Sequence, residues 1–227
     1  MSVAKTKPNK SGRRRSGRPT KEQAEELTEH IIDVATRLFL EVGFETTSVD
    51  LIAATTRISK QTFYARFVSK DALLSAVIRK RVNDLLMPVI RAPGDAGPIE
   101  TTLVRIAFEL SKRGLAPTAV AIDRLIASEA HQYPQLALTY QESRAQTRCL
   151  IAEILSNAMR EDQLRAADAH FLAEQFQYAL IDGPTRALIL SGQAAISDKD
   201  LHDRIVAAVG LFLDGCRGRP ASRHESP

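Results

Sequence analysis

The sequence predicts an all-α protein with about nine helices, in which an N-terminal three-helix domain with a helix-turn-helix is joined to a larger C-terminal helical domain. Apolar residues recur every three or four positions through most of the chain from residue 20 onwards, which is the spacing of a buried helix face. The alternation of apolar and polar residues that is typical of a half-buried strand is not sustained anywhere. With 227 residues, 44% of them apolar, the chain can bury the core of one large domain or two small ones.

The first four helices are marked by residues that cap helix ends. Thr20 and Gln23 form a capping box at the start of the first helix, which is predicted at 21–42. Gly43 ends it. Hydroxyl residues that can accept hydrogen bonds from free N–H groups precede three more helices, predicted at 48–54, 59–65 and 70 to about 90. Pro88 can kink the last of these or end it early.

Five further helices are predicted after a loop. The segment from Arg91 to Pro98 contains two prolines and two glycines, so it ends the fourth helix and forms a connection. Apolar residues then recur at helical spacing in five segments, at about 103–110, 119–130, 136–158, 166–191 and 198–216. Ser197 is the expected cap of the last helix, followed by an acidic first turn.

Positive charge is concentrated at the N-terminus. The chain has 31 Lys and Arg against 27 Asp and Glu, a net charge of +4, but residues 1–20 hold seven basic residues and no acidic one. Residues 1–19 are almost free of apolar side chains and are predicted to be a disordered basic arm. Such an arm can attract DNA phosphates and enter a minor groove, or it can simply be a solubilising tail.

Composition and motifs exclude several classes of protein. Apolar stretches without charge, such as 205–213, fall short of the ~18–20 residues that span a bilayer, and no signal core follows the basic N-terminus, so a cytoplasmic protein without membrane contact is expected. The two cysteines and five histidines lack the spacing of a disulfide framework or metal site. Nucleophile-elbow, phosphate-loop and zinc-binding motifs are missing too, so the sequence predicts no enzyme, no metal and no cofactor.

The segment 48–65 has the shape of a helix-turn-helix, whose second helix fits the DNA major groove. Val49, Phe63 and Phe67 are predicted to be core residues. The polar residues that remain to face outward are Thr47, Ser48, Lys60, Gln61, Thr62, Tyr64 and Arg66. The last five, on the second helix, offer hydrogen-bond donors without a competing carboxylate. Helical hairpins with polar faces also occur in proteins that do not bind DNA, so the spacing alone leaves both interpretations open.

Three segments and the end of the first helix resemble the DNA-binding domain of TetR-family transcriptional regulators. They are Thr46–Ala53, Ile58–Phe67, Ser69–Leu74 and, before them, Ala35–Phe44, and the resemblance extends from Thr20 to about Arg81. It implies an all-helical homodimer, usually a repressor, that binds a near-palindromic double-stranded DNA operator and releases it when a small-molecule effector fills the C-terminal domain. The competing hypothesis is a helical ligand-binding or architectural protein whose basic arm holds DNA without sequence preference.

The resemblance also implies which residues meet DNA. The family's contact positions correspond here to Thr46, Thr47, Ser48, Lys60, Gln61, Thr62, Tyr64, Arg66 and Lys70. Gln61 and Thr62 are the best candidates for reading base edges, whereas Tyr64 and Lys70 match positions that contact phosphate. Arg66 stands where the family often has histidine, which predicts stronger salt dependence.

The turn of the helix-turn-helix departs from the family pattern. The family often has Ala-Gly before the aliphatic residue, and this chain has Thr56-Arg57. If Arg57 adopts the left-handed backbone conformation, it costs about 1 kcal/mol relative to glycine.

The C-terminal half resembles the C-terminal domain of AefR-like members of the family, most clearly from Arg124 to Leu138. The predicted organisation is a disordered basic arm at 1–19, a helix-turn-helix DNA-binding domain at 20–68, a helical ligand-binding and dimerisation domain at 69–217 and a disordered tail at 218–227. Asp123, Arg124 and Glu129 are interpreted as a solvated or internally paired helix face.

The dimer interface and the effector pocket are assigned by position. The last two helices match the family's dimer pair, which gives as interface candidates Phe176, Ala179, Gly183, Ala187, Ile205, Val209 and Phe212. The alternative is that these are core positions within one subunit. Pocket candidates among the helices from about 99 to 180 are Phe108, Ile122, Tyr140, Phe176 and Tyr178, and core packing is the alternative for each.

Overall fold

The computed structural model describes residues 20–91, 97–191 and 196–216, and every regular element in these ranges is helical. The elements are α1 (Lys21–Glu41), α2 (Val49–Thr56), α3 (Lys60–Tyr64), α4 (Lys70–Arg91), α5 (Ile99–Gly114), α6 (Pro117–Glu129), α7 (Pro134–Arg160), α8 (Ala169–Gln177), the π-helical η1 (Tyr178–Asp182), α9 (Gly183–Ser191) and α10 (Asp198–Cys216). Because α8, η1 and α9 follow one another without a break, the described residues form nine continuous helices, and the predicted all-α fold is confirmed. The predicted basic arm and C-terminal tail lie outside the described residues.

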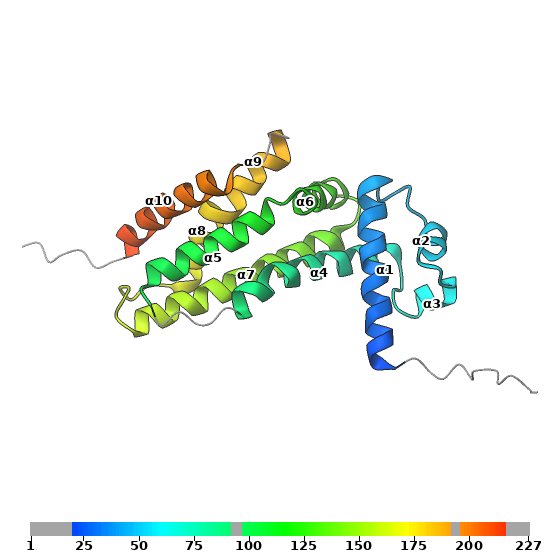
Figure 1. Ribbon diagram of the computed structural model, residues 1–227, viewed down its shortest axis with the longest axis horizontal. Helices are drawn as coiled ribbons and strands as arrows, with labels where there is room; N and C mark the ends of the chain where they lie inside the picture. Colours follow the sequence, from blue (N-terminus) through cyan, green and yellow to red (C-terminus); the bar gives the residue numbers. More distant parts are fainter. Residues whose placement is uncertain (1–19, 92–96, 192–195, 217–227) are drawn as a thin grey trace, which may run out of the picture.

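The helices α1, α2 and α3 form a unit at one end of an elongated molecule, and α1 lies crosswise to α4 and α7 (Figure 1). The other helices build a longer bundle, in which α10 packs along α5 and α7 packs along α8. No helix within the described ranges combines the length and the apolar character needed to cross a bilayer.

Two apolar clusters hold the molecule together. The N-terminal cluster contains buried residues of α1, α2, α3 and the first half of α4, and it also contains Ile122 and Ile126 from α6 and Leu136 from α7. The C-terminal cluster joins the second half of α4 to α5, α7, α8, η1 and α10. Helices α4 and α7 contribute buried side chains to both clusters and therefore connect the N-terminal unit to the bundle.

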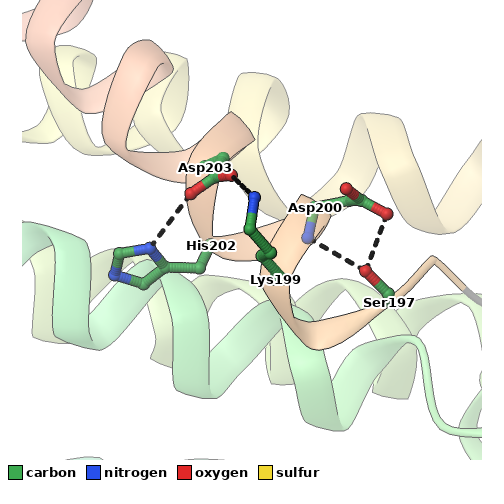
Figure 2. Close-up of polar contacts among 5 residues, drawn as sticks. All are labelled: Ser197, Lys199, Asp200, His202 and Asp203. Carbon is green, nitrogen blue, oxygen red and sulfur yellow. Dashed lines mark hydrogen bonds and ion pairs between the residues drawn. The ribbon is translucent and has the colours of Figure 1, made fainter.

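The predicted caps of α1 and α10 are confirmed, whereas α2 is capped by Ser48 and not by the preceding Thr47. The N–H of Gln23 donates to Thr20 Oγ1 at 3.2 Å, and the N–H of Thr20 donates to Gln23 Oε1 at 3.1 Å. At the start of α10, the N–H of Asp200 donates to Ser197 Oγ at 3.1 Å (Figure 2). The predicted boundaries shift by a few residues, and Pro88 lies inside α4 without ending it.

A π turn interrupts the helix that the sequence predicted as continuous from 166 to 191. The N–H of Gly183 donates to the carbonyl of Tyr178, and a Cβ at position 183 would lie 3.2 Å from that carbonyl oxygen. Glycine therefore permits this close approach. The hydroxyl of Ser111 donates to the carbonyl of Leu180 at 2.9 Å and fixes the π turn against α5. Such turns are frequent at functional sites, and this one carries both Tyr178 and Asp182.

Candidate functional site

The turn between α2 and α3 has the geometry of a helix-turn-helix. Arg57 has φ 57° and ψ 38°, so the left-handed conformation considered for it is confirmed. The N–H of Ile58 donates to the carbonyl of Ala53 at 3.0 Å, which satisfies the end of α2 and turns the chain towards α3. The left-handed arginine costs about 1 kcal/mol relative to glycine.

The short helix α3 depends on one buried ring. Five residues are too few for a stable isolated helix. Phe63 is fully buried in the N-terminal cluster and packs against Phe67, with ring centroids 5.8 Å apart. Ser59 caps the helix by accepting from the N–H of Thr62 at 3.0 Å. Phe63 therefore fixes which side of α3 faces outward.

Five of the nine predicted DNA-contacting residues are exposed, and three of these five lie on α3. The exposed ones are Thr46, Ser48, Lys60, Gln61 and Tyr64, and Tyr64 is 52% exposed. Thr62 and Arg66 are half-buried, because the Thr62 hydroxyl lies 2.8 Å from Ser59 Oγ and Arg66 Nη1 donates to the Thr62 carbonyl at 3.2 Å. The two exposed residues of α3 that point away from its buried face are thus Gln61 and Tyr64, beside Lys60.

Two of the predicted contacts have other roles. Thr47 is fully buried, and its hydroxyl donates to the Gly43 carbonyl at 2.7 Å, so the expectation that it faces outward is wrong. Lys70 Nζ donates to the Phe44 carbonyl at 2.6 Å and lies 4.3 Å from the centroid of the Phe44 ring. Both side chains hold the turn that follows α1. The sequence could not show this, because Thr47 beside Gly43 looks the same whether it faces in or out, and Lys70 is 26 positions from the carbonyl that it contacts.

The interpretation that no carboxylate competes for the recognition helix is also wrong. Asp50 Oδ1 in α2 lies 2.6 Å from Lys60 Nζ, and both side chains are exposed. The hydrogen bond from Lys60 to Asp50 raises the pKa of Lys60, so the ammonium stays charged at neutral pH. A phosphate that approaches Lys60 must therefore compete with Asp50.

Replacing Asp50 by asparagine should strengthen binding to DNA of any sequence at low salt. Lys60 would then be free to neutralise one more phosphate, so the slope of the logarithm of the association constant against the logarithm of salt concentration should steepen by about 0.9. Fluorescence anisotropy with a labelled duplex across a salt series measures this slope. Asp84→Asn, which makes the same change of net charge on α4, is the control, and equal slopes for the two variants would contradict the prediction.

The N-terminal unit is tied to the bundle by an aromatic contact and a hydrogen bond. Tyr133, between α6 and α7, packs edge-on against Phe44 with ring centroids 5.2 Å apart. Its hydroxyl donates to Glu45 Oε1 at 2.7 Å, which raises the pKa of Tyr133 to about 12 and keeps it a donor. The start of α7 is therefore fixed to the turn after α1.

A buried ion pair joins α4 to α6 in the same region. Arg81 holds Asp123 in a two-point contact, with Nη1 2.8 Å from Oδ1 and Nη2 2.9 Å from Oδ2. The Asp123 side chain is 2% exposed. Burial raises the pKa of Asp123 and outweighs the lowering by Arg81 and Arg144. Of the two sequence interpretations of Asp123, internal pairing is correct.

The five predicted pocket residues do not meet in one cavity. Tyr140 and Tyr178 line the same cavity, of 800 Å³, between α6, α7, η1 and α9. Ile122 lines a different cavity of 360 Å³ against α1 and α4, and Phe108 lines a third of 540 Å³ between α5 and α10. Phe176 is fully buried and packs against Phe212 at 5.3 Å, so core packing describes it.

The predicted dimer residues also divide into two groups. Phe176, Ile205 and Val209 are fully or almost fully buried within their own subunit, so their assignment to a subunit contact is wrong. Ala179, Gly183 and Ala187 are exposed, and Phe212 is half-buried. The large exposed apolar residues of this region, which the sequence interpretation did not assign to the interface, are Tyr178, Leu190, Val206 and Leu211. Val206 and Leu211 lie on α10, Tyr178 lies in η1 and Leu190 lies in α9.

Two family models match the sequence. Residues 31–77 match the model described as bacterial regulatory proteins, tetR family, and residues 101–215 match the AefR-like transcriptional repressor C-terminal domain. The second match alone covers half of the chain.

Individual relatives agree with these models. The HTH-type transcriptional regulator UidR of Escherichia coli (strain K12) is 25% identical over 141 residues, 62% of this chain and 68% of UidR. The HTH-type transcriptional regulator AcrR of Shigella flexneri is 38% identical over 60 residues, and this match spans 26% of the chain and 28% of AcrR. The solved structure of the flavonoid-responsive regulator FrrA is 30% identical, with a TM-score of 0.73 over 86% of this chain and 100% of FrrA.

Proposed function

Because the chain belongs to the TetR family of transcriptional regulators, we propose that it is a homodimeric repressor that a small molecule releases from a palindromic DNA operator. The observation that carries the proposal is the outward face of α3, where Gln61, Tyr64 and Lys60 are exposed on a helix held from behind by Phe63. A helix of this kind enters the major groove with its first residues against base edges.

The exposed apolar residues support the dimer. Tyr178 and Leu190 on η1 and α9 are 54% and 77% exposed, and Leu211 on α10 is 77% exposed. The helices α9 and α10 lie along the same edge of the molecule in Figure 1. Two such faces related by a two-fold axis would bury these side chains together, and the exposed Ala179, Gly183 and Ala187 would allow close approach of the helices.

The position of α6 supports a ligand response. This helix gives Ile122 and Ile126 to the N-terminal cluster and Ala127 to the wall of the 800 Å³ cavity. A molecule that binds in the cavity can therefore act on a helix that also packs against the DNA-binding unit. The name of FrrA, a flavonoid-responsive regulator, supports a small-molecule signal in a related protein.

Selection of binding sites from random duplex DNA by the purified protein tests the proposal. The expected product is a palindrome whose half-sites are one helical turn apart, bound at least ~1,000-fold more tightly than a scrambled duplex at physiological salt. Equal binding of both duplexes with a steep salt slope would contradict the proposal and would favour an architectural protein that holds DNA by charge alone.

Replacing Gln61 by alanine should relax sequence preference rather than weaken all binding. An amide that reads a base edge contributes about 1–3 kcal/mol of discrimination, so the preference for the selected base pair should fall about 5- to 150-fold. Competition between duplexes that differ at one position measures this. Tyr64→Phe is the matched control, because loss of a phosphate contact weakens binding to every duplex alike; if Gln61→Ala also did so, base readout by Gln61 would be disproved.

A further inference from the structure

The 800 Å³ cavity between α6, α7, η1 and α9 has an unusual distribution of charge. Its volume falls in the range of about 300–1,000 Å³ that small-molecule sites occupy. Arg144 and Arg148 from α7 and Arg186 from α9 line it, and among its described lining residues the single carboxylate is that of Asp182. Three guanidinium groups thus face one carboxylate across a space large enough for a ligand.

Arg144 is the central charge of this cavity. Its side chain is 17% exposed and forms an ion pair with Asp182, which is 22% exposed. In the amide orientation that satisfies its neighbours, the buried Gln177 accepts from Arg144 Nε at 2.9 Å and from Nη2 at 3.1 Å. Burial lowers the pKa of Arg144, Tyr140 and Asp123 act in the opposite direction, and the charges of Arg81 and Arg148 lower it further. The guanidinium is therefore held between Asp182 and Gln177.

Apart from Gln141, the remaining walls are apolar or aromatic. The Tyr140 ring lies 5.7 Å from the Arg144 guanidinium carbon, and Ala127, Tyr178 and Leu190 complete the surface. The three arginines favour a ligand with a negative charge, and the apolar and aromatic walls favour a ligand whose remaining surface is apolar.

We propose that this cavity binds an apolar small molecule that carries one carboxylate, and that this carboxylate replaces Asp182 as the partner of Arg144. A planar guanidinium binds a carboxylate through two parallel hydrogen bonds, and Arg186 at the rim adds a second positive charge. The inference rests on the proposed function, because the occupant would be the effector of the regulator.

The displacement of Asp182 gives the ligand a route to the DNA-binding unit. Asp182 is the last residue of the π turn, and its release would remove the ion pair that joins η1 to α7. On the opposite wall, α6 carries Ala127 in the cavity and Asp123 in the ion pair with Arg81 of α4. A ligand that favours one arrangement of these helices shifts the population of DNA-binding conformations by its difference in affinity for the two states.

Calorimetric titration of the full-length protein with matched acids and amides tests the inference. The probes are naphthalene-2-carboxylate and decanoate, each compared with its neutral amide. We expect at least one acid to bind about tenfold or more tightly than its amide, because only the acid makes charge-assisted hydrogen bonds to Arg144. Equal affinities of acid and amide, or no binding of either acid, would overturn the proposal.

Three variants locate the site. Arg144→Gln should abolish the difference between acid and amide, and Arg186→Gln, at an exposed position on the face proposed for the dimer, should reduce it several-fold in a protein that remains dimeric. Asp182→Asn removes the resident competitor and should increase the affinity for the acid. An Asp182→Asn protein that bound the acid no better than the wild type would show that the acid does not exchange with this carboxylate, which contradicts the inference.

Binding to the selected operator, measured with and without the acid, separates the two proposals. If an acid binds and its binding requires Arg144, but the operator complex stays intact, the result would support the carboxylate site and contradict ligand-controlled release. Specific operator binding by a protein that distinguishes neither acid from its amide would support the regulator and overturn the carboxylate site.

Discussion

Replacing Asp123 by alanine is expected to lower the free energy of unfolding by about 3–5 kcal/mol. The substitution leaves Arg81 without its carboxylate at a position where the arginine side chain is only 13% exposed, and it also removes a negative charge that Arg144 senses. An uncompensated buried guanidinium is far more costly than the pair itself is favourable. Equilibrium unfolding in urea, followed by circular dichroism, measures the change.

Two further variants separate this effect from a general loss of acidic residues. Asp84→Ala removes an exposed carboxylate, 3.5 Å from Lys80, on α4, and should change stability by less than about 1 kcal/mol. The double variant Arg81→Met with Asp123→Leu should recover most of the lost stability, because it removes both charges and fills their space. If Asp123→Ala were no more costly than Asp84→Ala, the ion pair would not be what stabilises the contact between α4 and α6.

Replacing Phe63 by alanine is expected to destabilise the N-terminal unit by about 3–5 kcal/mol and to abolish binding to the selected operator. Phe63 is fully buried and is the residue of α3 that enters the N-terminal cluster, so its loss leaves a cavity behind the recognition helix. The five-residue helix has too few hydrogen bonds of its own to stay in place. Thermal unfolding and operator titration with the same preparation provide the two measurements.

The neighbouring tyrosine supplies the control for this prediction. Tyr64→Phe alters only an exposed hydroxyl on the same helix and should leave stability within about 0.5 kcal/mol. Its ring packs edge-on against Phe63 at 5.4 Å, and that contact is preserved. A Phe63→Ala protein that still bound the operator with wild-type affinity would mean that α3 is held by other contacts than this ring.

The sequence predicted the helices because their signals are local. The capping box of α1 and the cap of α10 each join residues three positions apart, so both can be read directly from the chain. Helical periodicity identifies buried faces in the same way, and it placed Phe63 and Phe67 correctly in the core. The π turn was not predicted, because the hydrogen bond from the Gly183 N–H to the Tyr178 carbonyl leaves the spacing of apolar residues along the chain almost unchanged.

The electrostatic partners were not predictable, because packing brings together residues that are far apart in sequence. Arg81 and Asp123 are separated by 42 positions, and Lys70 lies 26 positions from the carbonyl that it caps. The pairing of Lys60 with Asp50 crosses from α3 to α2 and depends on the angle between the two helices. A charged residue can be recognised in a sequence, but its partner cannot be identified until the helices are placed.

The contact between Lys60 and Asp50 also affects how fast a regulator of this kind finds its target. A chromosome offers about 10⁶–10⁹ competing sites, and each lysine that is free to bind phosphate lengthens the time spent on every one of them. Lys60 already forms an ion pair with Asp50 at 2.6 Å before it meets DNA, so this lysine would add little to the affinity for DNA of the wrong sequence. If α3 enters the major groove as proposed, Asp50 would thus shorten the residence time on non-operator DNA and leave discrimination to neutral side chains such as Gln61.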